Sequence, residues 1–95
     1  MVRILLIISY DIQNDKLRTR FHKFINQYGT RLQFSVYEIR NSSRILSIVE
    51  TEINETFMPL FSEDDTVMIF RIDDNKITRY GYAKHDEEND MIVID

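Results

Sequence analysis

The architecture of this chain follows from residues 3–21, which read RILLIISYDIQNDKLRTRF. The apolar run from Ile4 to Ile8 does not alternate with polar residues, so we expect a strand over residues 3–10 that is buried on both faces. The run ends at Tyr10 and Asp11, and an arginine-rich helical pattern follows at once. A carboxylate at the end of a buried strand is either a turn residue or a metal ligand. The rest of the chain has to distinguish between the two.

A first helix is predicted directly after this strand. Asn14 or Asp15 is a suitable N-cap, and Gly29 is a suitable left-handed stop at the other end. Between them, apolar residues recur at helical spacing, at Leu17, Phe21, Phe24, Ile25 and Tyr28.

Residues 31–39, RLQFSVYEI, alternate and predict one strand. The alternation places Phe34 and Val36 on one face and Tyr37 on the other. A second helix is expected from Ser42 or Ser43 to just before Pro59. Its apolar stripe is Ile45, Leu46, Val49, Ile53 and Phe57.

Two further strands are predicted as a hairpin. TVMIFRI (66–72) and ITRYGY (77–82) flank the polar turn at residues 73–76. The most economical fold is an α/β (α+β) ferredoxin-like sandwich of the β-α-β-β-α-β type, with an antiparallel sheet and two helices on one face. We assign residues 1–82 to this domain.

The second face of such a sheet needs a cover, and a second copy of the chain is the simplest one, which predicts a homodimer. Tyr37 is expected on this face. Residues 83–95 are interpreted as an acidic connector followed by an extra C-terminal strand that serves as a docking tail. The tail either adds to the edge of a partner's sheet or pairs within its own chain, and the pattern favours neither. The residues that we expect to dock are Tyr37, Met91, Ile92, Val93 and Ile94.

Composition excludes several classes of protein. There is no cysteine, so disulfides and thiolate zinc sites are impossible. No apolar run reaches the roughly 18 residues of a membrane span, and the N-terminus does not resemble a signal peptide, so we expect a cytoplasmic protein that does not bind membranes. Residues 1–44 carry eight Lys or Arg and three Asp or Glu, a net charge of +5, within a chain of net charge −4. The basic N-terminal half has enough cations to bind phosphates.

The known catalytic and binding motifs are absent. The chain has no nucleophile elbow, Walker loop or glycine-rich dinucleotide turn, and its only glycines are Gly29 and Gly81. His22 and His85 have no histidine partner at metal-ligand spacing and are interpreted as surface residues. An RNA-recognition motif is excluded because the two central strands lack its stacking aromatic residues.

Asp11 is the remaining candidate for a catalytic or metal-binding residue. Mg²⁺ uses one or two carboxylates together with waters and substrate phosphates. In a two-fold dimer packed through the open sheet faces, Asp11 meets its symmetry mate, which supplies the second carboxylate. The cations that gather phosphate beside it are Lys16, Arg18, Arg20 and Arg31. From the residues alone, turn and cap roles for Asp11 and Asp15 are favoured over the metal site.

Residues 4–39 also resemble a known family. Tyr10-Asp11-Ile12, Asp15-Lys16 with Arg18, Tyr28-Gly29, Arg31, Gln33 and Ser35-Val36-Tyr37-Glu38 are similar to the signature of the small CRISPR-associated adaptation proteins, the Cas-two family. This resemblance implies a ferredoxin-like homodimer whose first-strand aspartates face one another. It also implies Mg²⁺-dependent endonuclease activity on single-stranded RNA or double-stranded DNA, with Asp11 as catalytic residue and metal ligand.

The same resemblance implies a role in spacer acquisition. The dimer would bind duplex DNA and bridge subunits of the CRISPR integrase, Cas-one. The alternatives are a toxin-type endoribonuclease that works without an integrase, and a small-molecule sensor of the ACT type. The latter usually has glycines in its ligand loop, and residues 10–15 have none.

Overall fold

Four strands and two α-helices form residues 3–81, the part of the chain that this computed structural model describes. The elements are β1 (Ile4–Asp11), α1 (Asp15–Asn26), β2 (Gly29–Gln33), β3 (Val36–Ile39), α2 (Ser43–Glu52) and β4 (Thr66–Asp73). A π-helical turn, η1 (Ile53–Phe57), and a 3₁₀ turn, η2 (Met58–Leu60), prolong α2, and a second 3₁₀ turn, η3 (Asp74–Lys76), follows β4. The sheet order is β2-β3-β1-β4, and every neighbouring pair is antiparallel. The expected ferredoxin-like α+β fold is confirmed.

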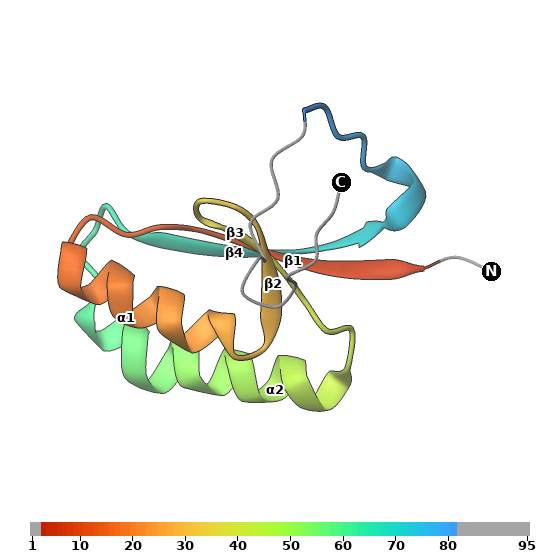
Figure 1. Ribbon diagram of the computed structural model, residues 1–95. Helices are drawn as coiled ribbons and strands as arrows, with labels where there is room; N and C mark the ends of the chain where they lie inside the picture. Colours follow the sequence, from red (N-terminus) through yellow and green to blue (C-terminus); the bar gives the residue numbers. More distant parts are fainter. Residues whose placement is uncertain (1–2, 82–95) are drawn as a thin grey trace.

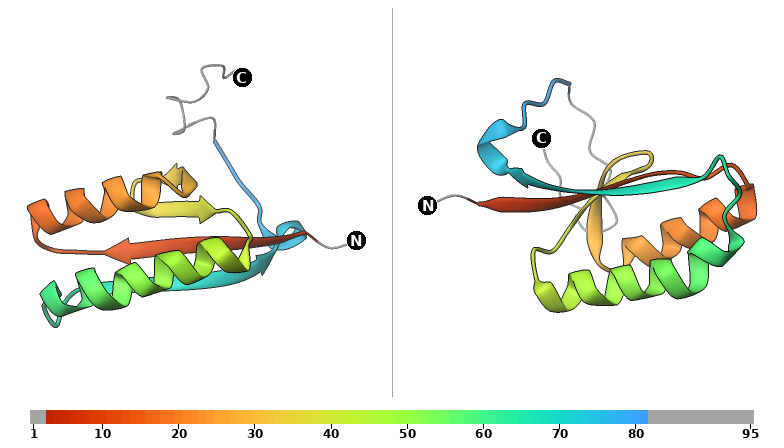
Figure 2. Two further views of the ribbon diagram at one scale, coloured as in Figure 1. Left: turned by 90° about the horizontal axis from the view of Figure 1, so that it is seen from below. Right: turned by 180° about the vertical axis from the view of Figure 1, so that it is seen from behind.

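The molecule has two layers. Both helices lie on one side of the sheet (Figure 1), and β1 runs between them when the molecule is seen from the helical side (Figure 2). We call the sheet face turned away from the helices the open face. Cross-strand partners share a face, so the open face carries Leu5, Ile7, Ser9 and Asp11 of β1 and Thr66, Met68, Phe70 and Ile72 of β4.

The core fills the space between the sheet and the helices. Leu6, Ile8 and Tyr10 of β1 point into it because alternate strand residues face the same side. The predicted helical stripes supply the other layer, with Leu17, Phe21 and Ile25 from α1 and Val49, Ile53 and Phe57 from α2 and η1. The N-caps are Asn14 and Ser42, whose side chains accept from the backbone N–H groups of Leu17 and Ile45.

The prediction of one strand over residues 31–39 was wrong. The chain turns at Phe34–Ser35 and forms the hairpin of β2 and β3. The turn shifts the alternation, so Tyr37 lies on the helical side of the sheet, 0% exposed in the core, and not on the open face. A fully buried side chain is not available for docking.

Gly29 also has another role than the predicted left-handed stop. Helix α1 ends at Asn26, Gln27 has right-handed helical dihedrals, and Gly29 begins β2 without a positive φ. A Cβ atom at Gly29 would lie 2.2 Å from the backbone oxygen of Glu38. Glycine is therefore needed here because the neighbouring strand approaches closely.

Residues 77–81 do not form the predicted second strand of a hairpin. The 3₁₀ turn η3 takes the chain away from the sheet plane on the side opposite to the helices (Figure 1). Ile77 to Gly81 line a hollow of about 620 Å³ together with Ile7, Val36 and Ile72 of the open face. The predicted domain boundary at 82–83, the docking strand Met91–Ile94 and His85 lie outside the described residues. Within residues 3–81, no helix is both long and apolar enough to span a bilayer.

Candidate functional site

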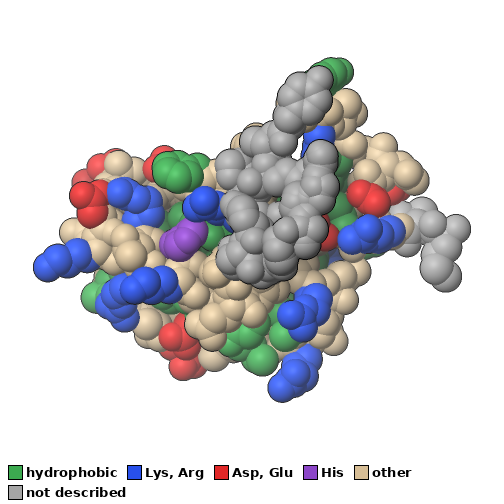
Figure 3. Space-filling model, in the orientation of Figure 1, with side chains coloured by type: hydrophobic (Ala, Val, Ile, Leu, Met, Phe, Trp, Pro, Cys, Tyr) green, Lys and Arg blue, Asp and Glu red, His purple; other side chains and the backbone are tan. Residues whose placement is uncertain are grey.

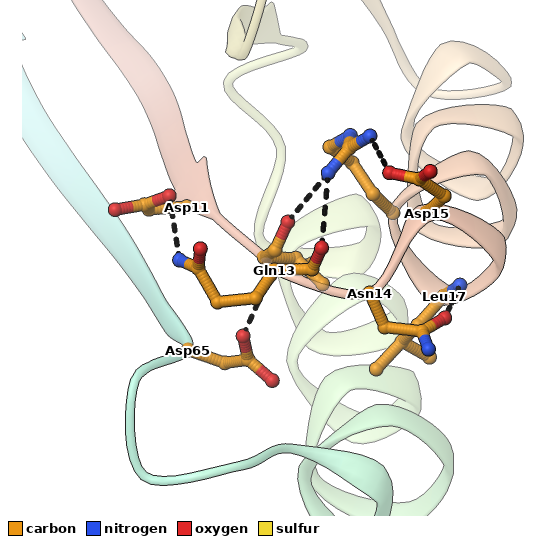
Figure 4. A network of polar contacts seen from close by, with 8 residues as sticks. Asp11, Gln13, Asn14, Asp15, Leu17 and Asp65 are labelled. Atoms are coloured by element: carbon orange, nitrogen blue, oxygen red, sulfur yellow. Dashed lines mark hydrogen bonds and ion pairs between the residues drawn. The ribbon is translucent and has the colours of Figure 1, made fainter.

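Asp11 is the last residue of β1 and lies on the open face, opposite Thr66 of β4. Four buried residues of the strand, from Leu5 to Ile8, fix the backbone that carries it, whereas its own side chain is exposed. The side-chain amide of Gln13 donates to Oδ1 of Asp11 at 3.1 Å (Figure 4). The sequence thus places a carboxylate on a rigid strand end where solvent and ligands reach it.

The loop after Asp11 is held from the side of α1 by Arg18. Its guanidinium donates to the carbonyl oxygens of Ile12 at 2.9 Å and Gln13 at 3.4 Å, and it forms an ion pair with Asp15 (Figure 4). Arg18 was predicted as a nucleic-acid contact. In the structure it also shapes the loop that follows Asp11, and Asp15 is its ion-pair partner and not the N-cap.

Asp65 holds the same loop from the side of β4. Its carboxylate accepts hydrogen bonds from the backbone N–H groups of Gln13 and Ser62, both at 2.8 Å. The N–H of Gln13, and next that of Ser62, favour the charged form and lower the pKa of Asp65 below its usual value. Asp65 is therefore a charged acceptor at neutral pH.

A donor-rich hollow of about 220 Å³, here called the basic pocket, lies between α1 and the β2–β3 turn. Its lining residues are Tyr10, Arg18, Thr19, His22, Arg31, Phe34 and Ser35. None of them is acidic. Figure 3 shows Lys and Arg side chains around the histidine on this face of the molecule. An anion with several oxygen acceptors fits such a lining.

Arg31 gives the basic pocket an unsatisfied donor. Its Nε–H is buried and has no hydrogen-bond acceptor among the described residues, and its guanidinium lies 5.5 Å from the centre of the Phe34 ring. A buried donor without an acceptor costs about 1–3 kcal/mol. An oxygen of a bound anion would remove this cost.

Tyr10 and His22 line the basic pocket, and the buried Tyr37 contacts His22 without lining the pocket itself. The Tyr37 hydroxyl and Nδ1 of His22 are hydrogen-bonded at 2.8 Å, and the Tyr10 hydroxyl lies 3.5 Å from the same nitrogen. Burial, with a smaller effect of Tyr37, raises the pKa of Tyr10 to about 12, although Arg31 and Arg18 act in the opposite direction. The hydroxyl group of Tyr10 is therefore neutral at physiological pH.

The four predicted cations are divided between two sides of α1. Arg18 and Arg31 meet at the basic pocket. Lys16 and Arg20 instead line a hollow of about 690 Å³ towards η2, together with Gln13 and Asp65. The guanidinium of Arg20 lies 5.9 Å from the centre of the Phe57 ring.

Sequence reasoning missed three residues of this region. His22, interpreted as a surface residue, is half-buried and hydrogen-bonded, and its position four residues after Arg18 was the available signal. Gln13 and Asp65 carried no signal, because a contact between residues 52 apart depends on the tertiary fold.

A metal site within one chain is not formed by the described residues. Residues 3–81 contain no cluster of three Asp, Glu or His side chains that could hold a cation. Asp11 offers one carboxylate, with the Ser9 hydroxyl on the same face of β1. These are oxygen donors of the kind that Mg²⁺ accepts, provided that waters, phosphates or a second carboxylate complete its shell.

Comparisons with known proteins identify relatives of the whole fold. The family model for CRISPR associated protein Cas2, the Cas-two family named above, matches residues 4–80. A CRISPR-associated endoribonuclease Cas2 of Methanospirillum hungatei is 31% identical over 90 residues, which cover 92% of this chain and 94% of the relative. Another, from Thermodesulfovibrio yellowstonii, is 34% identical over 83 residues, which cover 86% and 87% of the two chains.

The fold has solved counterparts as well. A crystal structure of Streptococcus pyogenes Cas2 at pH 6.5 superimposes with a TM-score of 0.64 at 16% sequence identity. The match covers 81% of this chain and 99% of that chain. At this identity the likeness concerns the fold alone.

Proposed function

Because the chain belongs to the Cas2 family of CRISPR-associated proteins, we propose that it is a metal-dependent endonuclease that also serves as a DNA-binding adaptor in spacer acquisition. The observation that carries the nuclease part is the exposed carboxylate of Asp11, held on a rigid strand end with Gln13 on one of its oxygens. The similar proteins named above are described as endoribonucleases.

The proposed cation is Mg²⁺, held by Asp11 of each of two chains. One carboxylate per chain is few for a Mg²⁺ site, and a two-fold axis through the open faces brings in a second carboxylate from the other chain. The bound cation would supply charge neutralisation at the scissile phosphate and activation of water. The protein's own part is to fix Asp11 through β1 and to present Ser9, a hydroxyl hydrogen-bond donor, on the same face.

Nucleic acid is proposed to bind through its phosphates at the basic pocket. The buried Nε–H of Arg31 lacks an acceptor among the described residues, and no acidic side chain lines this hollow. Lys16 and Arg20 offer further cations on the other side of α1. Phosphate contacts position a strand without reading its sequence, which suits an enzyme or adaptor that accepts single-stranded RNA or duplex DNA of many sequences.

A homodimer is proposed to form through the open face. Met68 and Phe70 are 52% and 40% exposed on it, beside the strand that carries Asp11. Large exposed apolar side chains on a sheet face are typical of protein interfaces. Residues 91–94 are proposed to dock on the partner chain or on the Cas-one integrase, in the cytoplasm.

Cleavage is tested with labelled single-stranded RNA and duplex DNA, with Mg²⁺ or with a chelator. We expect Mg²⁺-dependent cleavage that Asp11→Asn abolishes. Asp64→Asn is the matched control, because it removes one exposed carboxylate from the segment before β4 and should cleave as the wild type does. Cleavage by Asp11→Asn would remove Asp11 from the mechanism.

The adaptor role is tested by a pull-down of the tagged chain from its host, followed by gel shifts on duplex DNA at two salt concentrations. We expect co-purification of an integrase and a shift that weakens steeply with salt, because phosphate contacts release counterions. Arg31→Lys should weaken DNA binding, since lysine lacks the forked donor geometry of arginine. A lone dimer without any shift on DNA would favour a toxin-type ribonuclease, for which the relatives named above give no support.

A further inference from the structure

One carboxylate connects the loop after β1 with the segment before β4. Asp65 accepts from the backbone N–H of Gln13 at 2.8 Å, across 52 positions of sequence, and also from the N–H of Ser62 at 2.8 Å. Figure 4 shows Asp65 directly beneath Gln13, with Asp11 on the other side of the glutamine. The backbone of Gln13 is thereby fixed by an element distant in sequence.

The side chain of Gln13, whose backbone is fixed in this way, contacts Asp11. Its Nε2 donates to Oδ1 of Asp11 at 3.1 Å and lies 3.4 Å from the backbone oxygen of Asp64. Both contacts use the two N–H bonds of one amide group. Among residues 3–81, no donor contacts the other carboxylate oxygen of Asp11, Oδ2.

We propose that Asp65 and Gln13 are positioning residues for Asp11, in the order Asp65, Gln13 backbone, Gln13 amide, Asp11 Oδ1. This inference rests on the proposed function, in which Asp11 is the carboxylate that holds a divalent cation. An exposed aspartate at a strand end samples several rotamers when nothing restrains it. The Gln13 amide selects the rotamer that leaves Oδ2 towards solvent.

The charge of Asp65 agrees with this order of contacts. The carboxylate of Asp65 is charged at neutral pH, and charge-assisted hydrogen bonds are stronger than neutral ones. Partners of metal ligands typically change metal affinity or activity by roughly 10- to 100-fold when they are removed. Asp65 accepts from Gln13 and has no hydrogen bond to Asp11 among the described residues, so its effect on Asp11 has to pass through Gln13.

The test measures Mn²⁺ binding by electron paramagnetic resonance, with Mn²⁺ as a spectroscopic substitute for Mg²⁺. We expect Gln13→Ala and Asp65→Asn each to weaken Mn²⁺ binding by about tenfold. In the Gln13→Ala background, Asp65→Asn should have little further effect, because both changes break the same connection. Asp65→Asn that weakens binding equally in both backgrounds would contradict the proposed order.

Asp64→Asn is the matched control for charge. It removes one carboxylate at the neighbouring position and keeps the backbone oxygen that Gln13 contacts. We expect wild-type Mn²⁺ affinity for this variant. An equal loss in Asp64→Asn would mean that Asp65 acts through overall charge, and the positioning role would be refuted.

A second measurement does not depend on metal or cleavage. ¹⁵N relaxation of the Gln13 side-chain amide should show an ordered group in the wild type and in Asp64→Asn, and a mobile one in Asp65→Asn. A mobile Gln13 amide in the wild type would overturn the inference even if the enzyme cleaves. An ordered amide in a wild-type protein without Asp11-dependent metal binding or cleavage would instead refute the proposed function and leave the connection itself standing.

Discussion

Tyr10 and His22 line the basic pocket beside its arginines, and Tyr37 is hydrogen-bonded to His22. The two phenol rings stack with centroids 6.3 Å apart, and their hydroxyl groups converge on Nδ1 of His22. Both tyrosine side chains are buried. The basic pocket is therefore lined by the neutral hydroxyl group of Tyr10, and its arginines face no carboxylate among the lining residues.

The buried Tyr10 predicts that the folded protein loses stability at high pH. Because burial raises the pKa of folded Tyr10 to about 12 from the ordinary tyrosine value of 10.0, its contribution to stability is complete below pH 10 and is lost as the pH rises towards 12. We expect Tyr10→Phe to shift the midpoint of alkaline unfolding, followed by circular dichroism, to higher pH. The control is Tyr80→Phe at a 93% exposed side chain, which should leave the midpoint unchanged. An identical shift in both variants would contradict a specific role of buried Tyr10.

Asp65 predicts the opposite dependence on pH. The backbone N–H groups of Gln13 and Ser62 hold the pKa of folded Asp65 below the ordinary aspartate value of 3.8, so its contribution to stability is present above that pH and is lost as the pH falls through the folded pKa. We expect Asp65→Asn to melt at a lower temperature than the wild type at pH 7. The difference should shrink as the pH falls below the ordinary aspartate value and disappear below the lowered pKa of folded Asp65, where the folded protein binds the proton as well. A difference in melting temperature that persists undiminished over this acid range would show that the asparagine acts by another route.

At the scale of elements, the first strand, the two helices and the strand over residues 66–72 follow from hydrophobic periodicity and caps, whereas the division of residues 31–39 into β2 and β3 does not. The alternating pattern is satisfied by one long strand as well as by two short ones. The turn at Phe34–Ser35 lacks the Asn-Gly or Asp-Gly signal of a tight hairpin. The sequence therefore predicted one strand in place of β2 and β3, and it assigned Tyr37 to the wrong face of the sheet.

Gly29 allows β3 to approach β2 closely where the two strands pair. Its missing Cβ lets the backbone oxygen of Glu38 approach, and the neighbouring atoms are backbone atoms that cannot move aside alone. We expect Gly29→Ala to destabilise the fold by about 1–3 kcal/mol, the usual range for overpacking. An alanine without a clash would instead stabilise by about 0.4–1 kcal/mol through the unfolded state. Urea denaturation therefore distinguishes the two by sign, with Thr30→Ala at the exposed next residue as control.

The candidate site could be predicted from the sequence only in part. The position of Asp11 at a strand end was predicted because an apolar run ends there, whereas its role as a metal ligand was implied by the family resemblance and stays a prediction. Arg18 and Arg31 were identified by type, but their meeting beside His22 depends on how the β2–β3 turn packs against α1. Gln13 and Asp65 are ordinary loop residues until the fold brings them to 2.8 Å.

At the scale of the whole molecule, the two faces of the sheet differ in what covers them. The helical face is filled by the core, whereas the open face presents Met68 and Phe70 in the same rows as Ser9 and Ile7 of β1. Asp11 lies at the end of those rows. A second chain packed on this face would cover the apolar side chains and bring a second Asp11 to the same region. The dimer and the metal site are thus one proposal.

Breaking the open face should therefore abolish cleavage as thoroughly as Asp11→Asn does. We expect Met68→Lys to be monomeric in sedimentation, because a lysine in an apolar interface loses its hydration. Met58→Lys is closely matched, since this methionine is also 52% exposed but lies on η2, away from the open face. It should stay dimeric and active. Phe70→Lys, one row further from Asp11, separates loss of the dimer from direct disturbance of Asp11. A monomeric variant that still cleaves RNA or DNA with Mg²⁺ would show that one carboxylate suffices, and the paired-aspartate mechanism would have to be abandoned.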